Sequence, residues 1–176
     1  MTPSADDRAS DGPGDEITVS LPDGSSRTLT AGATADDLAA DIGAGLAKAA
    51  VIAEVNGIER DLVHPLEDGD QVAIVTASTD QGLYVIRHST AHVMAQAVLE
   101  LFPGATLGIG PPVQDGFYYD FELPDGAAFS EDDLGAIEGR MKQILNESQP
   151  YVRDEIAADD ARAIFADHPY KLEIID

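Results

Sequence analysis

The chain has 176 residues, of which 44% are hydrophobic and 24% are charged, and its formal net charge is −23. This composition is typical of a soluble globular protein and excludes a disordered chain. The absence of cysteine excludes disulfides, thiol catalysis and thiolate metal sites within these residues. Because so acidic a chain repels phosphate backbones, sequence-independent nucleic-acid binding is disfavoured, and an RNA role would need a local contact or a basic partner.

Hydropathy and the amino-terminal sequence both argue against a membrane protein. No apolar run approaches the roughly 18–20 residues that are needed to span a bilayer. The start, MTPSADDRAS, has neither the basic nor the apolar region of a secretory signal. We therefore expect no membrane partner and a cytoplasmic location.

The first elements are a tail and a hairpin. Residues 1–15 are rich in Pro, Gly, Ser and Asp and lack large apolar residues, which predicts a disordered tail. Apolar and polar residues then alternate over 17–21, which predicts a strand. This strand turns over 22–25 and returns over 27–30, because Pro-Asp-Gly-Ser is a turn sequence.

A helix is predicted next, with Thr34 as its N-cap. Asp36 and Asp37 fall in its first turn, where negative charge favours the helix dipole. Gly43 and Gly45 are expected to end it.

Three further strands complete the first unit. Residues 51–55 are an apolar run that stops at Asn56-Gly57, a strong hairpin signal, and a short strand follows. Residues 72–75 form a closing strand after a turn at 67–70. This order predicts a small α+β roll over 16–77, of the β-grasp (ubiquitin-like) type, with one helix on one face of a mixed sheet.

A second α+β unit is predicted over 78–176. A helix from Gly82 to Phe102 opens it and ends at Pro103-Gly104. Strands are expected over Thr106–Ile109 and Gly116–Leu123, where apolar and polar residues alternate.

The remainder of this unit begins with a capping box. Ser130 and Asp133 are spaced to open a helix that continues to about Asn146. Beyond it we expect a strand over 151–156, a helix over 158–166 and an alternating apolar and polar segment over 170–175. Since Asp176 falls in the middle of this pattern, the unit is expected to be incomplete.

The candidate functional residues are two histidines in HSTAH, His88 and His92. Residues four apart in a helix lie about 40° apart around its axis, so both imidazoles point the same way. On a helical wheel the pair lies at the border between a broad apolar arc and a narrow polar arc. This position predicts partial burial along the wall of a cleft.

Three interpretations of this pair are open from the residues alone. The first is two ordinary helix residues that hydrogen-bond to the backbone. A metal site would need a third ligand, and neither His64 nor His168 has a recognisable ligand spacing. A catalytic site would use imidazole, which titrates near neutrality, to place or deprotonate water.

Lys171 is a weaker candidate, as one of only ten basic residues and in an apolar context. The alternative for Lys171 is an ordinary lysine at a strand edge. Phosphate-cradling lysine loops, serine elbows and HExxH motifs are absent from the sequence.

Several longer motifs carry a resemblance to a known family. HSTAH at 88–92, IGPPVQDGFYYDFE at 109–122 and PYKLEII at 169–175 closely resemble the N-terminal region of bacterial threonyl-tRNA synthetases. ITVSLPDGSSRTL and VNGIERDL are similar to the TGS domain that opens those enzymes. The resemblance covers nearly everything from Glu16 to Asp176.

This resemblance implies an editing domain after the TGS domain, which hydrolyses serine mistakenly attached to threonine tRNA. His88 and His92 match the HxxxH editing motif of the family, and Lys171 matches a residue that acts with them. Tyr119 and Gly110 match the substrate-binding part of the same pocket. The resemblance implies no metal in this site.

The resemblance also implies properties of a longer parent enzyme. The parent attaches threonine to tRNA(Thr) with ATP and Mg, holds a zinc in a catalytic core that these residues lack, and is a homodimer. The chain itself is expected to be a monomer without a cofactor. The second editing motif of the family contains a cysteine, and this chain has none, so we expect half of an editing site and at most feeble deacylation.

Three other functions remain as alternatives. One is a freestanding hydrolase that edits in trans, which would need the missing Cys/His motif. Another is a non-catalytic TGS-type regulatory or RNA-binding module. The third is an alanyl-type editing domain, in which HxxxH helps to bind zinc.

Overall fold

The computed structural model describes residues 15–149, 152, 154–166 and 168–175. The chain divides into two compact units between Leu83 and Tyr84. The tail expected at 1–15 lies outside the described residues except for Asp15, whose carbonyl accepts a hydrogen bond from the Ala31 N–H.

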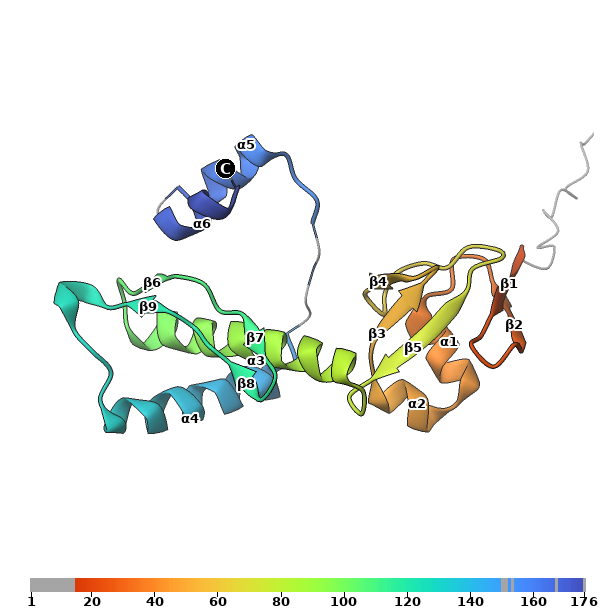
Figure 1. Cartoon of the computed structure of the whole chain (residues 1–176), viewed down its shortest axis with the longest axis horizontal. Helices are drawn as coiled ribbons and strands as arrows, with labels where there is room; N and C mark the ends of the chain where they lie inside the picture. Colours follow the sequence, from red (N-terminus) through yellow and green to blue (C-terminus); the bar gives the residue numbers. More distant parts are fainter. Residues whose placement is uncertain (1–14, 150–151, 153, 167, 176) are drawn as a thin grey trace, which may run out of the picture. The chain divides into compact units, whose positions relative to one another are not determined.

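The first unit contains two antiparallel groups of strands (Figure 1). Strand β1 (Glu16–Ser20) pairs with β2 (Ser26–Thr30). Strand β3 (Ala50–Val55) lies between β4 (Ile58–Arg60) and β5 (Val72–Thr76). A single parallel bridge between Ser20 and Gln71 links the two groups, so the sheet is mixed as predicted.

The Asn56-Gly57 turn between β3 and β4 is confirmed, and it has a second role. Asn56 and Gly57 both have positive φ, 52° and 78°, as a two-residue hairpin turn of this type requires. The Asn56 side-chain amide donates to a carboxylate oxygen of Asp70 at 2.7 Å, and the Glu67 N–H donates to the other at 2.8 Å. The buried Asp70 carboxylate therefore joins the two turns at one end of the sheet.

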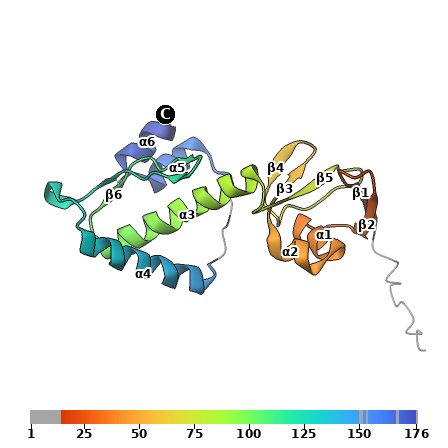
Figure 2. The same ribbon diagram turned by 60° about the horizontal axis from the view of Figure 1, so that its bottom comes forward.

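Two helices, rather than the single one expected, cover one face of the β3–β5 group (Figures 1 and 2). Helix α1 (Ala35–Ile42) begins at a capping box of Thr34 and Asp37 and ends at Gly43. Helix α2 (Ala44–Ala49) follows at once, so Gly45 lies inside a helix and the prediction that it ends one is wrong. The core of this unit joins both groups of strands to α1, with Val19, Leu38 and Val72 almost fully buried.

The second unit is built on two long antiparallel helices (Figure 1). Helix α3 (Asp80–Leu101) begins just before the junction of the units, and α4 (Glu131–Glu147) runs back along it. None of the described helices is both long and apolar enough to cross a membrane. The apolar core between the two helices includes Val93, Ala97 and Val98 of α3 and Ile137 and Ile144 of α4.

Four short strands lie between α3 and α4 in the sequence and form a ribbon. Their bounds are β6 (Thr106–Leu107), β7 (Pro112–Val113), β8 (Gly116–Phe117) and β9 (Phe121–Glu122). Strand β6 pairs with β9 and β7 pairs with β8, so the single strand predicted over Gly116–Leu123 is interrupted. The interruption arises because the chain changes pairing partner there, although the Tyr118 and Asp120 N–H groups still donate to the carbonyls of Pro111 and Ile109. A 3₁₀ turn (Pro124–Gly126) ends the ribbon.

The last two elements are short helices, α5 (Ala158–Ile164) and α6 (Pro169–Ile175). Within the strand expected over 151–156, the described residues 152 and 154–156 form no strand, and residues 151 and 153 lie outside the described set. The segment 170–175 is helical, so Lys171 lies on a helix and not at a strand edge. Pro169 favours this start because its fixed φ suits the first turn of a helix.

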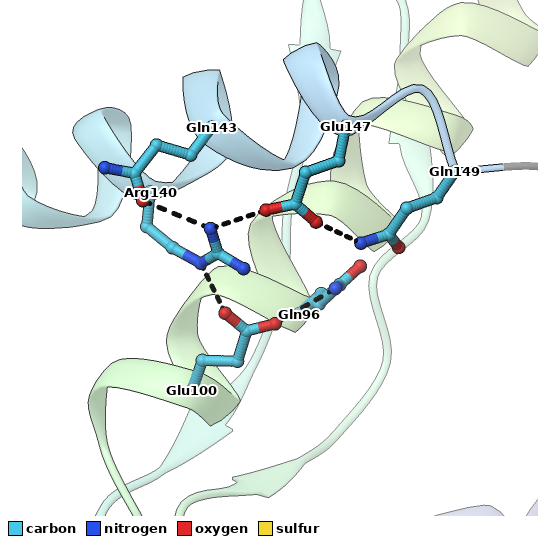
Figure 3. Close-up of polar contacts among 6 residues, drawn as sticks. All are labelled: Gln96, Glu100, Arg140, Gln143, Glu147 and Gln149. Atoms are coloured by element: carbon cyan, nitrogen blue, oxygen red, sulfur yellow. Dashed lines mark hydrogen bonds and ion pairs between the residues drawn. The ribbon is translucent and has the colours of Figure 1, made fainter.

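A single guanidinium joins α3 to α4 on the surface (Figure 3). Arg140 of α4 donates to the Glu100 carboxylate of α3 and to Glu147 at 2.9 Å. The other oxygens of these two carboxylates accept from the side-chain amides of Gln96 and Gln149. The hydrogen bonds that Arg140 donates to both carboxylates raise the pKa of Arg140 above its ordinary value. Exposed ion pairs contribute little to the free energy of unfolding. The contacts of Arg140 with Glu100 and Glu147 therefore fix the register of the two helices more than they stabilise the fold.

The capping box that opens α4 offers a test of the fold. The Ser130 hydroxyl accepts from the Asp133 N–H, and the Asp133 carboxylate accepts from the Ser130 N–H at 2.7 Å. We expect Ser130→Ala to lower the free energy of unfolding by about 1 kcal/mol, because an N-cap acceptor is lost. Chemical denaturation followed by far-UV circular dichroism measures this loss. Ser130→Asn, which keeps an acceptor, is the control, and an equal loss in both variants would contradict the capping assignment.

Candidate functional site

The two predicted histidines lie next to each other along one edge of α3. The ring centroids of His88 and His92 are 4.8 Å apart and the ring planes are 28° apart, so the imidazoles stack. Ala91 and Ala95 beside them are buried, whereas both histidines are exposed, which corrects the prediction of partial burial for the pair. The small alanines allow other elements to approach this edge of the helix closely.

His92 lines a pocket of about 490 Å³. Five residues of α3 form one wall, and residues from the ribbon and from the α5–α6 segment form the others. The pocket is lined by His92, Ala95, Gln96, Leu99, Glu100, Leu107, Tyr119, Phe165 and Lys171. Three of the predicted site residues, His92, Tyr119 and Lys171, therefore meet in one pocket although they are far apart in the sequence.

Gly110 supports this pocket without lining it. A Cβ atom at this position would lie 2.2 Å from Cδ2 of the Tyr119 ring, so the ring lies directly against the backbone of Gly110. On its other side the Tyr119 ring stacks on Phe121, with centroids 4.9 Å apart. Burial raises the pKa of the Tyr119 hydroxyl, which therefore remains protonated at neutral pH. The structure thus gives Gly110 a packing role against the Tyr119 ring, and the substrate contact that the resemblance implies for Gly110 stays a prediction.

His92 is electrostatically distinct in this pocket. Desolvation of the part of the ring that faces the pocket lowers the pKa of His92 below its usual 6.5, and the charges of His88 and Lys171 lower it further. A neutral imidazole is the form that can accept a proton. At pH 7 His92 is therefore available as a base, beside a cationic ammonium group.

No metal site is formed in the part of the chain that the structure describes, where no three His, Asp or Glu side chains are close enough to hold an ion. His64 lies in the first unit, and His168 lies at the start of α6 without lining the pocket. The polar groups that line the pocket are an imidazole, an ammonium group, a phenol, the side-chain amide of Gln96 and the carboxylate of Glu100.

Sequence reasoning missed several residues of this pocket. Gln96 and Glu100 continue the four-residue step of the histidines along α3, so helical spacing could have indicated them. Leu107 and Phe165 carried no signal, because their place in the pocket depends on how distant segments pack. Gln96 and His92 also line a second pocket of about 380 Å³, whose apolar wall includes Ile144 and Leu145 of α4.

The close approach of Gly110 and Tyr119 generates a prediction. Gly110→Ala should lower the free energy of unfolding by about 1–3 kcal/mol, because the added methyl displaces the ring from its stack on Phe121. Chemical denaturation measures the loss, and the chemical shifts of the Tyr119 ring report its displacement. Gly116→Ala is the matched control, since a Cβ there meets nothing within 4 Å. A Tyr119 ring that does not move in Gly110→Ala would contradict the packing described here.

Comparison with known proteins gives this geometry a family context. Residues 17–76 match the model of the TGS domain. The chain is 49% identical over 159 residues to a threonine–tRNA ligase of Rubrobacter xylanophilus, with 90% of this chain and 25% of that protein covered. Threonine–tRNA ligases of Maricaulis maris and Staphylococcus saprophyticus are 50% and 43% identical over 161 and 162 residues.

The similarity covers most of this chain but only a small part of each relative. The comparisons with the relatives from M. maris and S. saprophyticus span 90% and 92% of this chain, but each covers only 25% of the relative. The chain thus spans about a quarter of the length of these relatives. With a TGS domain at residues 17–76 and similarity over nine-tenths of its length, the chain corresponds to an N-terminal region of the threonine–tRNA ligases.

Proposed function

We propose that the pocket around His92 is part of an editing site that hydrolyses seryl-tRNA(Thr). The site would belong to a longer cytoplasmic enzyme that attaches threonine to tRNA(Thr) with ATP. The observation that carries this proposal is the convergence of His92, Tyr119 and Lys171 on one pocket from three separate segments. The names of the relatives support threonine and its tRNA as the substrates of the whole protein.

The chemical demand on such a site follows from the two amino acids. Threonine exceeds serine by one methyl group, and a pocket sized for the larger molecule excludes the smaller one by only about 10–200-fold. A ligase therefore needs a second site that hydrolyses the wrong product. That reaction is attack of water on the ester bond between the seryl group and the terminal ribose.

The residues of the pocket suit this hydrolysis. Neutral His92 accepts a proton as water adds to the ester carbonyl, and the tetrahedral intermediate collapses with loss of the ribose oxygen, which takes up a proton. The ammonium of Lys171 stabilises the negative charge that develops on oxygen. His88, stacked on His92, orients that ring, and Tyr119 offers a protonated hydroxyl to the substrate.

A deacylation assay tests this proposal. The substrates are seryl-tRNA(Thr) and, as a control, threonyl-tRNA(Thr), and the proteins are this chain and the full-length R. xylanophilus ligase. Because the cysteine-containing motif of the family is absent from this chain, we expect feeble hydrolysis by the chain and rapid, serine-specific hydrolysis by the ligase.

Substitution of single histidines in the ligase makes the test residue-specific. Alanine at the position that aligns with His92 should slow the hydrolysis by about 100-fold or more, as expected for loss of a general base. Alanine at the position that aligns with His64, which lies outside the pocket, should leave the rate unchanged. If the full-length ligase leaves seryl-tRNA(Thr) intact, the editing proposal fails and the TGS-type binding module becomes the better description.

The lowered pKa of His92 also predicts the shape of the pH profile. Imidazole loses its function as a base only when the pH falls through its pKa, and for His92 that pKa lies below 6.5. After subtraction of uncatalysed hydrolysis, the catalysed rate of the ligase should fall as the pH is lowered, with half of the rate lost below pH 6.5. A midpoint above pH 6.5 would rule out His92 as the base.

A further inference from the structure

Lys171 lines the pocket from α6, which follows a stretch of the chain without regular structure. Helices α5 and α6 pack on each other, and they follow a stretch in which the described residues 152 and 154–157 have no regular structure. Val152 in this stretch is 79% exposed. The position of Lys171 therefore depends on the contacts that hold the α5–α6 hairpin to the ribbon.

One polar contact joins the hairpin to the ribbon next to Lys171. The hydroxyl of Tyr170 on α6 donates to Oε2 of Glu122 on β9, at 3.2 Å. The carboxylate of Glu122 raises the pKa of Tyr170, so the phenol remains protonated and remains a donor at neutral pH. In Figure 2, α5 and α6 lie beside the ribbon, to which the bond between Tyr170 and Glu122 joins them.

Glu122 lies on the same short segment that carries another wall of the pocket. It follows Phe121, on which the Tyr119 ring stacks, and Tyr119 lines the pocket opposite α3. On α6, Lys171 directly follows Tyr170 and lines the same pocket. The hydrogen bond therefore ties together the two segments that supply the phenol and the ammonium group.

We propose that Tyr170 and Glu122 are positioning residues, whose hydrogen bond holds the α5–α6 hairpin against β9 and thereby places the Lys171 ammonium beside His92. This inference rests on the proposed editing function for its catalytic meaning. The position of Lys171 that it describes can be tested in this chain by a measurement that needs no enzymatic activity.

The His92 ring reports the distance to Lys171. The ionisable groups that face it are His88 and Glu100 from α3, Tyr119 from the ribbon and Lys171 from α6. Of these, Lys171 is the group that moves if the hairpin is released. The pKa of His92, measured by NMR titration of its imidazole, therefore detects release of the hairpin.

The titration is carried out on the wild-type chain and three variants. Lys171→Gln should raise the pKa of His92, because a nearby positive charge is removed. Tyr170→Phe, which deletes only a hydroxyl, should produce at least half of that rise. In the double variant, Tyr170→Phe should add nothing to the effect of Lys171→Gln, since the ammonium that it displaces is already absent.

Variants of the acceptor and a distant tyrosine are the controls. Glu122→Gln keeps a side-chain oxygen acceptor and should leave the pKa of His92 close to that of the wild type, whereas Glu122→Ala should raise it as Tyr170→Phe does. Tyr84→Phe, at an exposed tyrosine outside the pocket, should change nothing. Far-UV circular dichroism confirms that α6 persists in each variant.

Two results would overturn the inference. One is a His92 pKa that is unchanged in Tyr170→Phe and Glu122→Ala while Lys171→Gln raises it. The other is an effect of Tyr170→Phe that is equally large with and without Lys171. A positive titration combined with an inactive full-length ligase would refute the editing function and leave the positioning contact intact, so the two proposals can fail separately.

Discussion

Helix α3 serves two surfaces of the second unit at once, and the shape of the pocket depends on this double use. One side of the helix contributes Val93, Ala97 and Val98 to the core against α4. The opposite edge presents His92 and Gln96 to the pocket, with the small buried Ala95 between core and pocket. Since both surfaces are on one rigid helix, the packing of the core fixes the direction in which the imidazoles point.

The basic side chains of the second unit have two uses: some pair with carboxylates, and Lys171 lines the pocket. Glu100 lines the pocket, yet Arg140 holds its carboxylate, and the Arg140 guanidinium also holds Glu147. Lys171 forms no ion pair with the carboxylates of the described residues. The charge of Lys171 is thus directed to the pocket and to the neighbouring His92, while Arg140, Lys142 and Arg162, among the described residues of this unit, are paired within or between its helices. A chain with a net charge of −23 can in this way still offer one locally positive site to an anionic ligand.

The structural features that could be predicted from the sequence are those that depend on interactions between residues close together in the chain. The N-cap at Thr34, the capping box at Ser130 and the turn at Asn56-Gly57 are correct to the residue, because each depends on hydrogen bonds across two to four positions. The α+β class follows from the order of such elements and is confirmed, as is the TGS domain that the resemblance indicates.

The features that could not be predicted depend on partners distant in the sequence. The segment 170–175 alternates as a strand does, but it is helical in the structure, and Pro169 favours the start of that helix. The role of Gly110 depends on a ring nine positions away that folds back onto it. Phe165 and Leu107 reach the pocket only through tertiary packing. The resemblance brought together His92, Tyr119 and Lys171, which spacing alone could not do.

The double use of α3 also restricts how this helix can change in evolution. Each residue turns the helix by about 100°, so one inserted or deleted residue near Val93 would rotate one surface away from the other. The imidazoles would then face the core, or the apolar residues would face water. Substitutions are tolerated position by position, but changes of length are not, and insertions in homologous chains should therefore fall in the turns of the ribbon and outside α3.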